Sequence, residues 1–433
     1  MYPVQLLNKL RGSSGFIAKN GLSVALRMAA IAFVFFPQRW MNLHLAGDVL
    51  KEVNVSLSVI GVILGILGLG IPQLLHRVYT HMEHTPERDV AWSSLAFVRL
   101  LSFFPGLVLV WLAAQFDLAS LEILTFLYIP AFLSLSDVAF RSIVDSDNRS
   151  WQYSFSDLIS KIVLNIVLFW AVVQIPFVAG WPNFYKYALA MTLSALSAVG
   201  LDLWLQRKYY RFVRPSRGYL RNARKTIFYL GLTGFLVGAF LTTDKIFLDR
   251  YKAGSVIING YANAYKLFEV ALVVPGITMP VLASSAIKRI QNATVEQKAA
   301  SVRKYLQTTL GVGLVVALGF ALCGPFVLQL VDPEEKYIDV ARIALWVLTP
   351  AIIVNFGGTF LAHMFVLSGH DRQEVQVQLR NLLFALVCYG VLIYFFSYVG
   401  AAVSTILIYC FDLGQRYFLF FSAREKLGLE KPH

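Results

Sequence analysis

The chain has 433 residues, of which 57% are hydrophobic, and its mean hydropathy is +0.63. This composition is more apolar than that of ordinary soluble domains, in which about 45–50% of residues are apolar. The net charge of +13 does not indicate a nucleic-acid-binding protein, because the charged residues lie between long apolar stretches and do not form one basic face. We therefore expect a protein that is embedded in a membrane.

Apolar stretches recur along the whole chain, and each is long enough to cross a hydrocarbon core about 30 Å thick as a helix. They lack the alternating pattern of transmembrane strands, so the predicted fold class is an all-α integral membrane protein. Hydropathy predicts about twelve spans. They lie near residues 16–37, 53–75, 91–114, 121–143, 155–178, 184–206, 226–248, 256–285, 305–331, 340–368, 378–397 and 399–421.

The distribution of basic residues predicts the topology. If the amino terminus is cytoplasmic, most of the 38 Lys and Arg residues fall in cytoplasmic segments and few fall in the outer loops. Cytoplasmic loops of membrane proteins carry this excess of positive charge, so both termini are expected in the cytoplasm. The cysteines, Cys323, Cys388 and Cys410, lie in apolar stretches, where thiols pack as small hydrophobic groups, and no disulfide or metal site is predicted.

Residues 207–225 form the longest basic segment, with eight Lys or Arg residues and no acidic residue. Because it lies halfway along the chain, it predicts an N-terminal lobe at residues 1–206, a cytoplasmic linker, and a C-terminal lobe at residues 226–433. We expect the linker to fix topology and to touch anionic lipid headgroups, with recruitment of a partner protein as the alternative.

A faint internal repeat supports two parallel halves of six helices each. Ala46-Gly47-Asp48-Val49 follows the first predicted span, and Ala253-Gly254-Ser255-Val256 follows the seventh. Chance similarity between apolar sequences is the alternative explanation for this repeat.

Several charged residues lie inside the predicted spans, where each charge costs about 2.5–3.5 kcal/mol on insertion scales. The basic residues are predicted to bind substrate in a cationic cavity, and they are Arg27, Arg99, Lys161, Lys245 and Lys266. The acidic residues are predicted to couple transport to an ion, and they are Asp157, Asp244 and Glu269. Neutral polar residues on the same helix faces are predicted to line the cavity, and they are Asn20, Asn165, Asn259 and Asn263.

Ion pairs that only fix helix packing are the alternative to these functional roles. Asp157 with Lys161 and Lys266 with Glu269 are spaced so that each pair can form within its own helix, as can Asp412 with Arg416. Arg27 and Arg99 have no carboxylate within one helical turn, so we expect them to act on a substrate. A guanidinium suits a bidentate grip on pyrophosphate.

Two stretches carry a resemblance to a known family: residues 61–77, which end in Leu67-Gly68-Leu69-Gly70-Ile71-Pro72, and residues 243–289, which contain Gly260-Tyr261-Ala262-Asn263. With them, the whole chain resembles bacterial polysaccharide exporters of the Wzx type, within the multidrug/oligosaccharidyl-lipid/polysaccharide (MOP) superfamily. The resemblance implies two six-helix lobes around a central cleft in the bacterial inner membrane. It also implies transport of undecaprenyl-pyrophosphate-linked oligosaccharide from the cytoplasmic to the periplasmic leaflet by alternating access.

The resemblance further implies coupling to a H⁺ or Na⁺ gradient, no cofactor, and a polysaccharide polymerase with its chain-length machinery as partners. A multidrug or cation antiporter of the same superfamily is the alternative, although its cationic substrates would favour an acidic cavity. An enzyme is not expected, because no catalytic motif is visible. From that class, a membrane-embedded glycan polymerase or acyltransferase is the alternative, and it would need a sizeable outer loop with paired catalytic residues.

Overall fold

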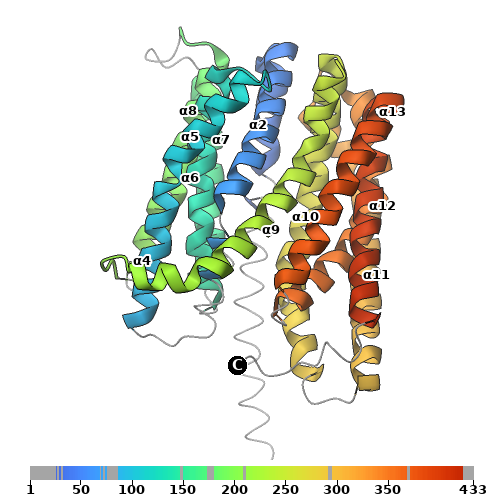
Figure 1. The fold of residues 1–433 in the computed structure, drawn as a ribbon. Helices are drawn as coiled ribbons and strands as arrows, with labels where there is room; N and C mark the ends of the chain where they lie inside the picture. The colour runs from blue at the N-terminus through green and yellow to red at the C-terminus, as the bar shows by residue number, and fades with distance from the viewer. Residues whose placement is uncertain are drawn as a thin grey trace, which may run out of the picture. The chain divides into compact units, whose positions relative to one another are not determined.

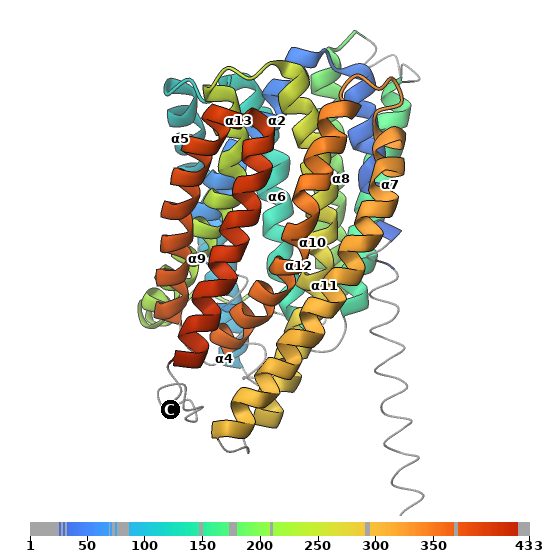
Figure 2. The ribbon, with the colours of Figure 1, turned by 90° about the vertical axis from the view of Figure 1, so that its right-hand side faces the viewer.

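The computed structural model describes residues 33–68, 86–146, 150–172, 180–207, 211–290, 295–367 and 371–422, with a few single residues and short pieces between 26 and 30 and between 70 and 75. All regular secondary structure in this part of the chain is helical (Figures 1 and 2). The predicted all-α fold class is therefore confirmed.

The helices follow the chain with short connections between them. Residues 33–44 are helical. The further elements are α2 (Gly47–Gly68), α4 (Pro86–Leu101), α5 (Phe103–Gln115), α6 (Leu121–Ser146), α7 (Ser150–Val172), α8 (Asn183–Gln206), α9 (Arg217–Arg250), α10 (Ser255–Ile290), α11 (Val295–Val331), α12 (Ile338–Leu367) and α13 (Asp371–Ser422).

The observed helices overlap the predicted spans, and several begin earlier than predicted. Seven helical stretches among the described residues are long and apolar enough to cross a membrane. The prediction of two spans on either side of residue 398 corresponds to α13, whose backbone leaves the helical conformation at Ser397 (φ 52°, ψ −132°). The first predicted span, residues 16–37, lies mostly outside the described residues.

The chain divides into two compact units. Unit 1 comprises residues 1–45 and 66–231, and unit 2 comprises residues 46–65 and 232–433. Helices α2 and α9 each contribute residues to both units, so the units differ from the predicted lobes in residues 46–65 and in the place of the basic segment. The division into lobes at residues 207–225 stays a prediction.

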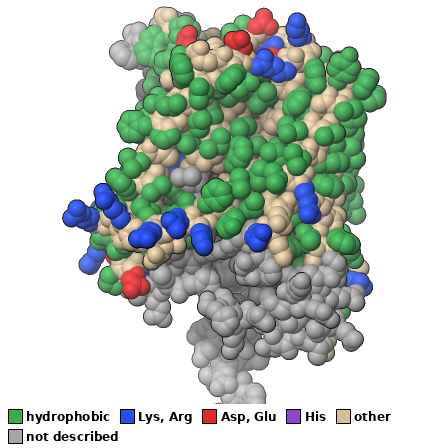
Figure 3. All heavy atoms as spheres, in the orientation of Figure 1, with side chains coloured by type: hydrophobic (Ala, Val, Ile, Leu, Met, Phe, Trp, Pro, Cys, Tyr) green, Lys and Arg blue, Asp and Glu red, His purple; other side chains and the backbone are tan. Residues whose placement is uncertain are grey.

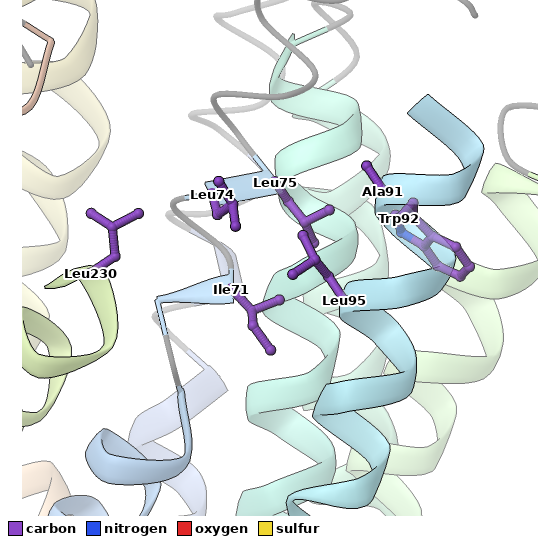
Figure 4. Close-up of a cluster of buried hydrophobic side chains, with 7 residues drawn as sticks. All are labelled: Ile71, Leu74, Leu75, Ala91, Trp92, Leu95 and Leu230. Atoms are coloured by element: carbon purple, nitrogen blue, oxygen red, sulfur yellow. The ribbon is translucent and has the colours of Figure 1, made fainter. Parts of the chain in front are cut away.

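In unit 1, close packing depends on small residues and on an apolar cluster. A Cβ atom at Gly106 of α5 would lie 1.8 Å from the hydroxyl oxygen of Tyr128 on α6, so only glycine fits there. The cluster consists of Ile71, Leu74, Leu75, Ala91, Trp92, Leu95 and Leu230 (Figure 4). It joins the residues that follow α2 to α4 and to α9.

In unit 2, glycines bring α2 close to α9. A Cβ atom at Gly65 would lie 3.2 Å from the Cα atom of Phe235, and one at Gly61 would lie 3.0 Å from the side chain of Thr242. Without a strong hydrophobic drive between helices in lipid, small residues at the interface allow the close backbone approach that dispersion forces need. This packing holds α2 beside the part of α9 that carries Asp244.

Candidate functional site

Asp244 is the centre of a buried polar cluster in unit 2. It lies on α9 and is completely buried. The hydroxyl of Tyr261 on α10 donates a hydrogen bond of 2.6 Å to its Oδ2, and the backbone N–H of Lys245 donates one of 2.8 Å to its Oδ1. Because both carboxylate oxygens receive donors, the burial of this group is partly offset by hydrogen bonding.

Two lysines accompany this carboxylate. The Nζ atom of Lys245 lies 4.7 Å from the ring centre of Tyr265, within the range of a cation–π interaction. The Nζ atom of Lys266 lies 2.8 Å from Oε2 of Glu269, one helical turn further along α10. Lys245 acts electrostatically on both Asp244 and Glu269. The cluster thus combines two cations with two carboxylates on adjacent helices.

The asparagines of α10 are buried beside this cluster. Asn259 accepts a hydrogen bond of 3.1 Å from the side chain of Asn54 and donates one of 2.9 Å to the carbonyl of Gly47. Asn263 is 1% exposed. Asn259 therefore joins α10 to α2, which is a packing role, and its predicted role in lining a cavity stays a prediction.

Arg99 lies in a different environment, in unit 1. This α4 residue is 4% exposed, and its Nη1 donates a hydrogen bond of 2.8 Å to the carbonyl of Leu67. The guanidinium carbon lies 4.4 Å from the ring centre of Phe132 on α6. Phe103 and Tyr128 stack beside that ring, with ring centres 5.6 Å apart. Arg99 is thus held by one carbonyl and an aromatic wall.

The other nitrogens of Arg99 have no hydrogen-bond partner: neither Nε nor Nη2 is paired. No ion pair joins this guanidinium to a carboxylate in the described part of the chain. A buried cation with two unused donors is costly unless something pairs with it. Two donors of this guanidinium are therefore buried without a hydrogen-bond partner among the described residues.

On α7 the predicted ion pair between Asp157 and Lys161 is present. The Nζ atom of Lys161 lies 3.8 Å from Oδ1 of Asp157, and each side chain is about one-third exposed. The side-chain amide of Asn165 donates to the carbonyls of Lys161 (2.7 Å) and Phe33 (3.0 Å). The spacing of Asp157 and Lys161 indicated this contact.

The predicted substrate-binding cations are thus found in three separate surroundings within the described residues. Lys245 and Lys266 share one cluster, Lys161 is paired on α7, and Arg99 stands alone. Arg27 and Asn20 lie outside the described residues. That these cations act on one substrate stays a prediction.

A second buried network was not predicted as a site. Arg416 of α13 is 1% exposed. Its Nη2 donates a 2.8 Å hydrogen bond to Glu374, and its Nη1 pairs with the same carboxylate. Its Nε donates a hydrogen bond of 2.9 Å to Asp412. Asn381 donates a 2.6 Å hydrogen bond to Asp412, and Gln378 donates one of 2.9 Å to Glu374. The spacing of Asp412 and Arg416 indicated one contact. Glu374, Gln378 and Asn381 share one helical face, which was the available signal for the rest.

Comparison with known proteins supplies the fold relationship. No family model and no curated protein matches the chain. Among solved structures, it is similar to a multidrug resistance MATE family transporter of the MOP superfamily in an inward-facing conformation, with 15% sequence identity and a TM-score of 0.66 over 95% of this chain and 99% of that one. The chain shares the fold of this transporter.

Two further solved structures share this fold. A variant of the Vibrio cholerae MATE transporter VcmN has 12% identity and a TM-score of 0.70, over 96% of this chain and 97% of that one. A MOP superfamily transporter from Pyrococcus furiosus has 16% identity and a TM-score of 0.67 over the same shares. The chain is therefore a multi-pass integral membrane protein, and at these identities its substrate is a separate question.

Proposed function

We propose that the chain is a transporter that moves an amphipathic, anionic substrate across the membrane. The observation that carries this proposal is Arg99, a buried guanidinium that keeps two donors free and contacts no carboxylate of the described chain. A transporter of cations would gain nothing from an unpaired buried cation. An anionic group with several oxygens, in contrast, can accept hydrogen bonds from both free donors at once.

The substrate class that fits best is an undecaprenyl-pyrophosphate-linked oligosaccharide, flipped from the cytoplasmic to the periplasmic leaflet of a bacterial inner membrane. The pyrophosphate would accept hydrogen bonds from Arg99, while the polyprenyl chain stays in lipid. Lys161, Lys245 and Lys266 are proposed to bind substrate as well. The carboxylates Asp157, Asp244 and Glu269 would bind the coupling ion, H⁺ or Na⁺. No cofactor is required, and the product would pass to a polysaccharide polymerase.

A multidrug or cation antiporter is the second candidate function. Solved structures of the same fold include a MATE transporter described as a multidrug resistance protein. The buried carboxylate of Asp244 is a group that could bind a cationic drug by an ion pair. The Pyrococcus furiosus transporter is described as having a binding pocket of reverse polarity that suggests a different function. Pocket charge is therefore the property that separates the two candidates.

Deletion of the gene distinguishes these candidates. If the protein is a flippase, the deletion strain loses surface polysaccharide and accumulates lipid-linked repeat units on the inner leaflet, with unchanged sensitivity to cationic drugs. Increased drug sensitivity with normal surface polysaccharide would instead support the antiporter.

Complementation with Arg99 variants tests the residue. Arg99→Gln should lower surface polysaccharide by about tenfold or more, because each hydrogen bond to a charged group contributes about 1.5–3 kcal/mol. Arg99→Lys should restore part of it. The matched control is Lys252→Gln, an exposed cation between α9 and α10, which should complement fully. Normal polysaccharide with Arg99→Gln, at normal membrane levels of the protein, would remove Arg99 from substrate binding.

A further inference from the structure

The basic segment that precedes and begins α9 forms one exposed cationic stripe on unit 1. At 100° per residue, Arg217, Arg221, Arg224 and Lys225 project into a single sector roughly 100° wide, and all four side chains are exposed. Phe228, which is 64% exposed, lies in the same sector. Figure 3 shows Lys and Arg side chains in a row over the first turns of α9.

The opposite face of these turns is firmly packed. Tyr219, Leu220, Ala223 and Ile227 pack against the apolar cluster formed with α4. Ser216 begins the helix, because its side-chain oxygen accepts a hydrogen bond of 3.2 Å from the backbone N–H of Tyr219. The stripe is therefore presented by a fixed helix and is not a loose linker.

The residues before the helix are also tied to α4. The side-chain oxygens of Ser93 and Ser94 accept hydrogen bonds from the backbone N–H groups of Val213 (3.0 Å) and Ser216 (2.9 Å). This anchoring leaves the side chains of Arg211 and Arg214 exposed. Among the described contacts, the carboxylate of Asp89 lies next to this segment. It accepts a hydrogen bond from the backbone N–H of Arg211 and not from the guanidinium.

The length of α9 places the stripe at the surface of the bilayer. The 34 residues of α9 exceed the roughly 20 residues that a helix needs to cross a hydrocarbon core about 30 Å thick. The surplus turns lie outside the core, and the charges identify them as the first turns. Arginine beside an exposed phenylalanine is typical of a helix at the level of the headgroups.

We propose that this stripe is a binding surface for the headgroups of anionic phospholipids. The exposed cations of the stripe are Arg217, Arg221, Arg224 and Lys225, and Arg211 and Arg214 are exposed just before them. The sequence from 207 to 225 contains no acidic residue. The positive charge of these cations is complementary to the negative phosphodiester groups of the lipids. Phe228 would reach the boundary between the headgroups and the acyl chains. The surface is separate from Arg99 and from the Asp244 cluster, so the inference does not depend on the proposed substrate.

Site-specific photocrosslinking tests the surface. The full chain, with Phe228 replaced by p-benzoylphenylalanine, is reconstituted in vesicles of equal parts phosphatidylglycerol and phosphatidylcholine, and lipid adducts are identified by mass spectrometry. We expect phosphatidylglycerol adducts to exceed phosphatidylcholine adducts by about threefold or more, since each basic residue near an anionic surface adds attraction. The same probe at Phe104, a residue of α5 that is 65% exposed, should show a ratio near one.

Charge removal completes the test. The variant R217Q/R221Q/R224Q should bring the ratio at Phe228 to about one, whereas K252Q/K336Q/R342Q, which removes three exposed cations elsewhere, should leave it unchanged. If the first variant fails to insert, the wild-type ratio in 0.5 M NaCl serves instead, because salt screens exposed charges. Equal adducts of both lipids would overturn the proposal, as would a protein adduct that predominates in native membranes.

Discussion

Single residues in α13 illustrate how a charge is stabilised inside a helical membrane protein. Arg416 contacts Glu374 and Asp412 and is almost completely buried. Breaking a buried pair by removing one partner costs about 3–5 kcal/mol, because the remaining charges lose their neutralising group. We therefore expect Arg416→Ala to lower the midpoint of thermal unfolding in detergent strongly, as followed by loss of folded protein in size-exclusion chromatography.

Arg380 is the matched control for this variant. It lies on α13 and is exposed, so Arg380→Ala should change the midpoint little. If Arg416→Ala unfolds at the same temperature as Arg380→Ala, the buried network does not stabilise the fold. Combining Arg416→Met with Glu374→Gln and Asp412→Asn removes all three charges and should recover much of the lost stability.

Residue contacts within one helix could be predicted from the sequence, whereas contacts between helices could not. The spacing of Asp412 and Arg416 indicated their pairing, as did that of Lys266 and Glu269. The partner of Asp244 is Tyr261 on the next helix. Helical periodicity fixes which residues share a face, but not which face of another helix it meets, so such partners require the structure.

At the scale of elements, the turn inside α13 separates two predicted spans. The backbone of α13 leaves the helical conformation at Ser397. Close to this turn, a Cβ atom at Gly400 would lie 2.0 Å from the carbonyl oxygen of Leu392. Because the obstacle is backbone, it cannot move aside cheaply, and Gly400→Ala should destabilise the protein by about 1–3 kcal/mol or more. The measurement is thermal unfolding in detergent.

Gly414 provides a control on the same element. A Cβ atom there meets nothing within 4 Å, so Gly414→Ala should be neutral or stabilising by about 0.5–1 kcal/mol, as expected for alanine in a helix. Equal effects of the two substitutions would show that the close approach at Gly400 is not required.

The elements themselves were largely predictable because a span must be long and apolar to satisfy its backbone in lipid. Their ends were less so. Hydropathy begins the seventh span at residue 226, but α9 begins at Arg217, since Ser216 caps the helix and its first turns pack on α4. Hydropathy detects the part of a helix that crosses the hydrocarbon core, but it does not detect turns of the same helix that continue outside the core.

At the scale of the whole molecule, the contacts group residues 46–65 with the second half of the sequence and residues 207–231 with the first. The basic segment predicted two lobes with a linker between them, and the repeat supported two halves. Neither pattern carries information on which residues are in contact. Glycines on α2 explain the difference for residues 46–65, since they allow α2 to pack closely on α9.

Ion coupling is the property of the whole transport cycle that these charges are predicted to control. Glu269 and Lys266 are each about two-fifths exposed, so this pair is accessible to ions in a way that Asp244 is not. We expect Glu269→Gln to reduce gradient-driven translocation of lipid-linked oligosaccharide in proteoliposomes and to weaken its dependence on H⁺ or Na⁺. The reason is that this substitution removes the carboxylate that would bind the coupling ion.

The double variant Lys266→Met with Glu269→Gln separates coupling from packing. If the pair only fixes α10, removing both charges should restore translocation together with its ion dependence, because no unpaired charge remains. If Glu269 couples transport to the ion, the double variant should regain stability while translocation stays independent of the gradient. Glu334→Gln, which breaks the exposed pair with Lys336 between α11 and α12, should leave both properties unchanged, because exposed ion pairs contribute about 0–1 kcal/mol.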